Sequence, residues 1–256
     1  MVDNNRFLFY ISHAFVGIFL GRRTKRNVYR LRSTYMKGRK STWITCEDPA
    51  FVGHEITDAD VLMFADQFEA LLVFPVNEPK TPFLLCTVGL VGSGKTTIMS
   101  ALKEHLPGVY LRTDDMRRFL ADQGYQTART SEIAEVIIER LVKKGHSVLV
   151  DADCAADYWR EPAEALAQYG VGIFWVHVVT SEAVILDRLR DDNPDREYKG
   201  EAARENYENR KVLHEHLSHP FYFTFHGDEP LEPQITAFLK QWPTLLSSAQ
   251  TSALTN

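Results

Sequence analysis

Residues 89–96 have the types and the spacing of a phosphate-binding loop. Their sequence, GLVGSGKT, fits the pattern G-x-x-x-x-G-K-[ST] at every fixed position. Backbone N–H groups must converge on phosphate oxygens in such a loop, so side chains must be absent where it turns. Lys95 is expected to reach the β- and γ-phosphates of ATP, and Thr96 to offer its hydroxyl to Mg²⁺. The residues expected to contact the nucleotide are Gly89, Gly92, Ser93, Gly94, Lys95, Thr96 and Thr97.

The surroundings of this run favour a nucleotide site over a glycine-rich turn without function. An apolar segment, residues 83–88, precedes it and predicts a buried strand, and residues 95–106 have a helical pattern. A helix that begins where the loop ends points its positive end at the same anion. For Thr97, an ordinary position in the first helical turn is the alternative.

Acidic residues follow two further predicted strands. Asp114 and Asp115 come directly after residues 109–113, and Asp151 comes directly after residues 147–150. Ligands of open α/β sheets bind at the carboxyl ends of the strands, so these carboxylates are expected near the phosphates. A phosphoryl acceptor needs such a group to orient its hydroxyl and accept its proton.

Two segments carry a resemblance to a known group of enzymes. RTDDMR, residues 112–117, resembles the acceptor-side motif of polynucleotide 5′-kinase-like and zeta-toxin-like P-loop kinases. VLVDAD, residues 148–153, with Arg160 downstream, is similar to the next motif of that group. The resemblance extends over about residues 81–217 and implies an ATP- and magnesium-dependent kinase.

The resemblance also implies roles for single residues. Asp114 would be the general base, Arg117 would neutralise charge near the acceptor, and Asp151 would hold the water shell of magnesium. Each has a plainer alternative. Asp114 or Asp115 would cap the helix that follows, Arg117 would be a solvated helix arginine, and Asp151 would be a turn residue.

Asp153 departs from the group, which often has asparagine or a neutral polar residue at this place. A second carboxylate could help to bind metal or could cap the next helix. Arg160 has a structural role at a helix end as its alternative.

Kinases of this architecture place arginines on a late, mobile lid, where they offset charge and exclude water. Arg188 matches the first lid arginine of the group, but Asp192 stands where another is frequent. Arg190 or Arg196 would substitute, and solvated arginines beside acidic neighbours are the alternative. The predicted catalytic residues are Lys95, Asp114, Arg117 and Arg188, and the predicted metal-binding residues are Thr96 and Asp151.

Several histidines follow the predicted lid. His214 and His216 are two residues apart, so a helix would turn them to different faces. Surface or packing roles are therefore expected for them, and a metal site is not.

Strand and helix patterns alternate after residue 82, which predicts a P-loop α/β sandwich of three layers with a mainly parallel, five-stranded sheet. Three prolines, at 75, 79 and 82, mark a boundary. We expect an N-terminal extension over 1–80, a P-loop kinase domain over 81–245 and a flexible tail over 246–256. The strands are expected at 83–88, 109–113, 147–150, 171–179 and 221–225, and the helices at 57–72, 95–106, 131–144, 159–169, 181–190, 201–217 and 231–242.

The composition is that of an ordinary soluble protein, with 45% hydrophobic and 25% charged residues in 256. A net charge of -5 gives no whole-molecule reason to expect nucleic-acid binding. Cys46, Cys86 and Cys154 lack CxxC spacing, so reduced thiols and a cytoplasmic location are expected.

The N-terminal region is basic. No acidic residue lies between Asp3 and Glu47, and an apolar run, residues 7–20, precedes most of the basic ones. This run is shorter than the roughly 20 residues that span a bilayer. The alternatives are a packed element, peripheral contact with anionic membrane through residues 7–40, and a true start at Met36.

The main hypothesis is an ATP- and Mg²⁺-dependent kinase that phosphorylates a hydroxyl of a small molecule or of a nucleic-acid 5′ end. An adenylylsulfate-kinase-like enzyme is the nearest alternative, because that family has a helix similar to residues 131–145. A non-catalytic nucleotide switch or adaptor is the other alternative. Neither the acceptor nor the oligomeric state follows from the sequence.

Overall fold

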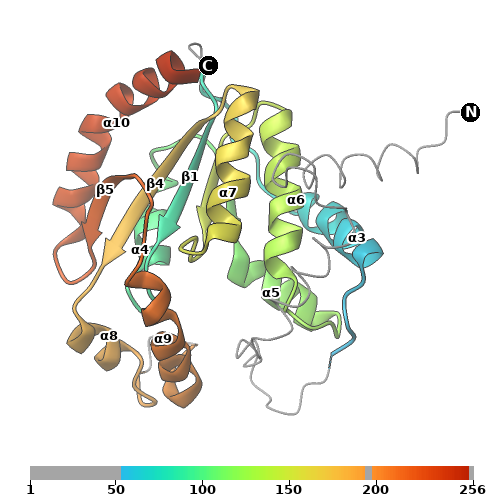
Figure 1. Ribbon diagram of the computed structural model, residues 1–256, viewed down its shortest axis with the longest axis vertical. Coiled ribbons are helices and arrows are strands. Elements are labelled where there is room, and N and C mark those ends of the chain that lie inside the picture. The colour runs from blue at the N-terminus through green and yellow to red at the C-terminus, as the bar shows by residue number, and fades with distance from the viewer. Residues whose placement is uncertain (1–52, 194–197, 254–256) are drawn as a thin grey trace, which may run out of the picture. The chain divides into compact units, whose positions relative to one another are not determined.

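The core of the fold is a sheet of five parallel strands in the order β2-β3-β1-β4-β5 (Figure 1). The central strand β1 is buried along its whole length, which explains its unbroken apolar sequence FLLCTV. The five-stranded parallel sheet predicted from the sequence is confirmed. The strands are β1 Phe83–Val88, β2 Val109–Arg112, β3 Val148–Asp151, β4 Gly172–Val179 and β5 Phe221–His226.

The structure is a computed structural model that describes residues 53–193 and 198–253. Alternate residues of the strands face opposite layers of helices. On β1, Leu84 and Cys86 pack with one group of helices, whereas Phe83 and Leu85 pack with the other. The first layer consists of α3 Asp58–Glu69, α5 Thr113–Asp122, α6 Thr130–Lys143 and α7 Asp157–Ala165, and the second of α4 Lys95–Leu102 and α10 Leu231–Ala253.

Two further helices, α8 Glu182–Arg188 and α9 Gly200–His214, lie at the carboxyl ends of the strands (Figure 1). They form a small third core with Leu90 and Val91 of the glycine-rich loop. This apolar contact ties the region predicted to be a lid to the loop. Residue 196, one of the two proposed substitutes for a lid arginine, lies outside the described residues.

Helix α3 shares the main core with the sheet, although it precedes the boundary predicted at residue 80. Thr57 and Asp60 form a capping box at its start. Phe64 is fully buried, and Arg140 of α6 donates to Asp66 at 2.6 Å. Ile56 and the helix that follows it therefore help to cover one face of the sheet. The predicted membrane contact over 7–40 lies outside the described residues.

Some helix ends differ from the expectation. Helix α4 ends at Leu102, and α7 gives way to a 3₁₀ turn, Leu166–Tyr169, that Gly170 terminates. Helix α10 continues to Ala253, so the tail expected from 246 is helical up to that residue. In the part of the chain that the structure describes, no helix has the length and apolar character needed to span a membrane.

Candidate active site

The glycine-rich loop follows β1 and leads directly into α4. Gly94 has φ +104°, a left-handed conformation that side chains rarely adopt. A Cβ added at Gly89 would lie 2.7 Å from the carbonyl oxygen of Val178. The fixed glycines are thus required by backbone shape and by close packing. Because α4 starts at Lys95 without a side-chain cap, its first N–H groups remain directed at the loop.

Lys95 stands at the centre of the site. Its Nζ donates to the carbonyl oxygens of Gly89 at 2.6 Å and Leu90 at 2.9 Å. Burial lowers the pKa of Lys95, and the nearby carboxylates of Asp153, Asp151 and Asp114 act in the opposite direction. The loop lysine and the carboxylates that follow two different strands are therefore brought together, as the sequence predicted.

Thr96 and Asp151 form the predicted metal pair. The Thr96 hydroxyl donates to Oδ1 of Asp151 at 3.3 Å. Asp151 is buried, and its other oxygen, Oδ2, accepts a hydrogen bond from the Tyr110 hydroxyl at 2.7 Å and lies 3.6 Å from Nε of Arg112. Burial raises the pKa of Asp151, and these hydrogen bonds counteract it. A hydroxyl and a carboxylate oxygen are the hard donors that Mg²⁺ prefers, so the pair fits that ion.

Asp114 and Asp115 lie in the first turn of α5 and do not cap it. The helix begins at Thr113, and no side chain caps its N-terminus. Asp114 Oδ1 accepts a hydrogen bond from Arg117 at 2.5 Å, whereas Asp115 Oδ1 accepts one from Arg112 at 3.2 Å. The Asp114 side chain is 51% exposed, so an acceptor can reach it. Its negative charge acts to raise the pKa of Lys95, which indicates that it lies near the loop.

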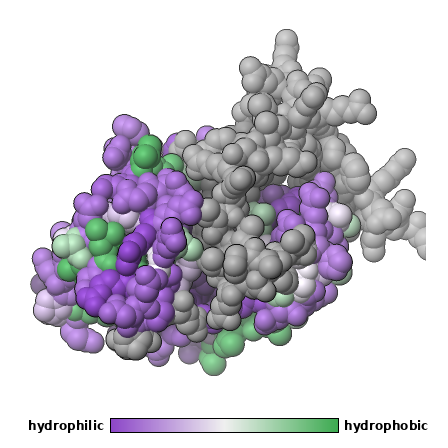
Figure 2. All heavy atoms as spheres, turned by 90° about the horizontal axis from the view of Figure 1, so that it is seen from below, coloured by the Kyte–Doolittle hydropathy of each residue, from purple (hydrophilic) through white to green (hydrophobic). Residues whose placement is uncertain are grey.

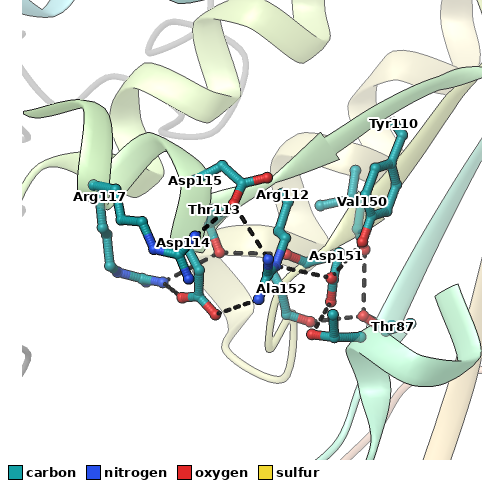
Figure 3. Close-up of polar contacts among 12 residues, drawn as sticks. Thr87, Tyr110, Arg112, Thr113, Asp114, Asp115, Arg117, Val150, Asp151 and Ala152 are labelled. Carbon is teal, nitrogen blue, oxygen red and sulfur yellow. Dashed lines mark hydrogen bonds and ion pairs between the residues drawn. The ribbon is translucent and has the colours of Figure 1, made fainter. Parts of the chain in front are cut away.

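Arg112 joins the two acidic regions. Figure 3 shows its guanidinium between Asp114, Asp115 and Asp151. The distances are 3.9 Å to Asp114, 3.2 Å to Asp115 and 3.6 Å to Asp151. Residues of β2 alternate in direction, so Tyr110 and Arg112, two apart, both reach Asp151 from the same side of the strand.

Arg188 lies against the loop. Its Nη1 donates to the carbonyl oxygen of Gly92 at 3.0 Å, and its Nη2 donates to that of Gly227 at 2.5 Å. Arg190 instead is exposed and pairs with Asp187 and Asp192, as the alternative of a solvated arginine expected. Of these two arginines, only Arg188 belongs to the site.

Other predicted residues have plainer surroundings. Thr97 is exposed in the first turn of α4. Arg160 pairs with Glu164 one turn along α7 at 3.2 Å. The hydroxyl of Ser93 is buried inside the loop and has no hydrogen-bond partner among the described residues.

Sequence reasoning missed a polar cluster beside the loop. Asp153 does not cap α7, whose N-cap is Ala156 without a side-chain bond. Instead it contacts His214 and Arg210 of α9, so of the two roles expected for His214, surface or packing, the structure shows packing, against a carboxylate. One signal was available: Arg210 and His214 are four residues apart, on one face of a helix.

Figure 2 shows the end of the molecule where α5, α8 and α9 lie, and the described side chains on this face are mostly hydrophilic. Among the described residues, no group of three or more His, Cys, Asp or Glu side chains could hold a metal ion. Within the described residues, Thr96 and Asp151 are the pair that would hold a magnesium ion here.

A family model matches the part of the chain that contains the loop. Residues 84–214, just over half of the 256, match a family described as an AAA domain. No curated protein matches the sequence. A gluconokinase from Sinorhizobium meliloti 1021 is similar in structure at 16% identity and a TM-score of 0.48, over 68% of this chain and 99% of that one.

Two other solved structures are similar to this chain. An APS kinase from Mycobacterium tuberculosis, solved with AMPPNP and APS, has 19% identity and a TM-score of 0.42, over 64% of this chain and 99% of that one. A structure of the PezAT toxin-antitoxin system of Streptococcus pneumoniae has 16% identity and a TM-score of 0.46, over 78% and 98%. At such low identities and scores, the fold assignment rests on strand order and loop geometry.

Proposed function

This chain belongs to the AAA domain family, and we propose that it is a kinase that transfers the γ-phosphoryl group of ATP, with Mg²⁺, to a hydroxyl group. The acceptor hydroxyl belongs to a small molecule or to a nucleic-acid 5′ end. The observation that carries the proposal is the position of two carboxylates beside the loop: Asp151, the last residue of β3, accepts from Thr96, and Asp114, just after β2, lies with Asp151 around Arg112.

The loop and Lys95 bind the triphosphate in this proposal. Lys95 exchanges its bonds to the carbonyls of Gly89 and Leu90 for bonds to the β- and γ-phosphates, and the N–H groups at the start of α4 face the same oxygens. Thr96 and Asp151 would hold Mg²⁺. The bound ion neutralises charge on the phosphates.

Asp114 acts on the acceptor. Its carboxylate accepts the proton of the acceptor hydroxyl while the oxygen of that hydroxyl forms a bond to the γ-phosphorus, and the bond from that phosphorus to the β-phosphate oxygen breaks to release ADP. Arg117, 2.5 Å from Asp114, holds the carboxylate in position. Arg188 supplies positive charge at the loop, where negative charge is transferred.

A direct test is an ATP-consumption screen of the full chain over sugars, nucleosides, adenylylsulfate and 5′-hydroxyl oligonucleotides. We expect ADP release that depends on one acceptor class and on Mg²⁺. Consumption with adenylylsulfate alone would support the adenylylsulfate-kinase-like alternative. Tight nucleotide binding without turnover on any acceptor would support the switch or adaptor. Peripheral membrane contact through residues 7–40 and a cytoplasmic location stay predictions.

A further inference from the structure

The cluster that sequence reasoning missed connects the first residue of the loop to helix α9. Asp153 Oδ1 accepts the backbone N–H of Gly89 at 3.4 Å. The same carboxylate contacts Nε2 of His214 at 3.1 and 3.2 Å, and Arg210 at 3.6 Å. The Asp153, His214 and Arg210 side chains are only 11%, 9% and 16% exposed. Both backbone groups of Gly89 are thereby held, since its carbonyl accepts from Lys95.

The Asp153 carboxylate has three partners in this cluster, which are the N–H of Gly89, Nε2 of His214 and the guanidinium of Arg210. A buried carboxylate that loses one of these partners must find another or move, because an uncompensated buried charge is costly. Gly89, bonded to the same carboxylate, would move with it.

Helix α9 reaches the loop by an independent apolar route. Its Ala203 and Tyr207 pack in one small core with Leu90 and Val91 of the loop. Lys211 of α9 also pairs with Glu182 of α8 at 2.7 Å, and α8 carries Arg188. The Asp153 cluster adds a polar attachment at the opposite end of α9, near its last turn, so the helix is fixed to the loop at two points.

We propose that Asp153 and His214 are positioning residues that hold Gly89 and α9 in the arrangement that binds the phosphates of the nucleotide. The inference rests on the proposed nucleotide site and adds residues to it. His214 acts through Asp153 and touches no reacting atom. The ring nitrogen Nε2 makes the contact with Asp153. Glutamine can donate from its amide at a similar distance, so it should replace His214 better than leucine does.

Calorimetric titration of the full-length chain with Mg²⁺ and the non-hydrolysable analogue AMPPNP tests this role. We expect His214→Leu to weaken binding at least about tenfold, because a hydrogen bond to a charged group is lost. His214→Gln should stay within about threefold of the unmodified chain. The matched control is His216→Leu, which alters an exposed histidine two residues away in the sequence and should bind normally.

A double-mutant cycle separates positioning from general loosening of the fold. In an Asp153→Asn background the charge is absent, and the amide oxygen can still accept from Gly89. His214→Leu should then cost less than about threefold in affinity. If the double variant instead lost affinity by the product of the two single-variant losses, the inference would be overturned.

Other outcomes are equally decisive. Unchanged affinity of a folded His214→Leu chain, or His214→Gln binding as weakly as His214→Leu, overturns the positioning role alone. No heat from the folded, unmodified chain overturns the proposed nucleotide site and this inference with it.

Discussion

The hydroxyl of Tyr110 donates a hydrogen bond of 2.7 Å to Oδ2 of Asp151, while Oδ1 of the same carboxylate accepts one from Thr96. The two oxygens of Asp151 therefore have different hydrogen-bond partners. Oδ2 is held by β2, and Oδ1 remains beside the hydroxyl that we expect to bind magnesium. Burial, Asp151 and its hydrogen bond raise the pKa of Tyr110, so it stays a donor at neutral pH.

Tyr110→Phe removes this donor with little change of shape. We expect the Mg²⁺ concentration needed for half-maximal AMPPNP binding to rise about tenfold, the lower end of the effect of residues that orient metal ligands. Titration of binding against Mg²⁺ measures it. Tyr222→Phe, on an exposed side chain of β5, is the control and should leave the curve unchanged.

Lys95→Ala should abolish nucleotide binding, because it removes the cation on which the loop carbonyls and three carboxylates converge. Calorimetry with Mg-AMPPNP measures the loss, and Lys240→Ala, on the exposed side of α10, should bind normally. Retained affinity in a folded Lys95→Ala chain would contradict the assigned role.

Asp114 and Asp115 offer a matched pair of substitutions. Asp114→Asn should keep nucleotide affinity and lose at least about 10²-fold in turnover, since the general base is gone. Asp115→Asn should keep most of the rate, because Asp115 pairs with Arg112 and Arg118, whereas Asp114 pairs with Arg117. The reverse ranking of the two rates would assign the base to Asp115.

Gly227, directly after β5, lies close to the loop. An added Cβ would lie 2.1 Å from the carbonyl oxygen of Ser93 and 2.2 Å from the hydroxyl of Thr180, so Gly227→Ala must displace the loop. We expect a lower Tm and at least about tenfold weaker AMPPNP binding. Gly145→Ala is the comparison, because its Cβ would meet no atom within 4 Å. It should cost stability through its positive φ and leave affinity unchanged.

His177 predicts a dependence of stability on pH. Burial is the main cause that lowers the pKa of His177, and the positive potential of His214 and His219 adds to it. The His177 ring stacks on Phe221, with ring centroids 4.4 Å apart. A histidine with a depressed pKa stabilises the fold above its unfolded pKa of about 6.5, and this contribution is lost as pH falls through the lower folded value.

Thermal unfolding between about pH 7.5 and 5 measures that contribution. His177→Gln should show a smaller fall in Tm on acidification than the unmodified chain. His216→Gln, at an exposed position, should follow the unmodified chain. Parallel curves for all three chains would show that His177 does not titrate as described.

The sheet and the loop could be predicted because local patterns determine them. Buried strands such as residues 83–88 have unbroken apolar sequences. The glycines are spaced with Lys95 and Thr96 as they are because the backbone of the loop can turn only where side chains are absent. Asp114 and Asp151 could be selected for the same reason, since a parallel sheet brings the ends of its strands to one edge.

Contacts between distant segments could not be predicted in this way. Asp153 and His214 are 61 residues apart, and Tyr110 meets Asp151 from a neighbouring strand. Helix α3 precedes three prolines that suggested a boundary, yet Arg129 and Arg140 join it to the rest of the first layer of helices. Such pairs form only when two distant elements pack side by side. The local pattern of a single sequence does not indicate which elements do so.

The attachment of α3 has a practical consequence. A shortened chain that starts at residue 81 would uncover the surfaces of α5 and α6 on which Phe64 and Phe68 rest, and would leave Arg129 and Arg140 without their acidic partners on α3. Water-exposed apolar surface of this kind promotes aggregation. Crystallisation or binding studies that trim the N-terminus should therefore cut before residue 53.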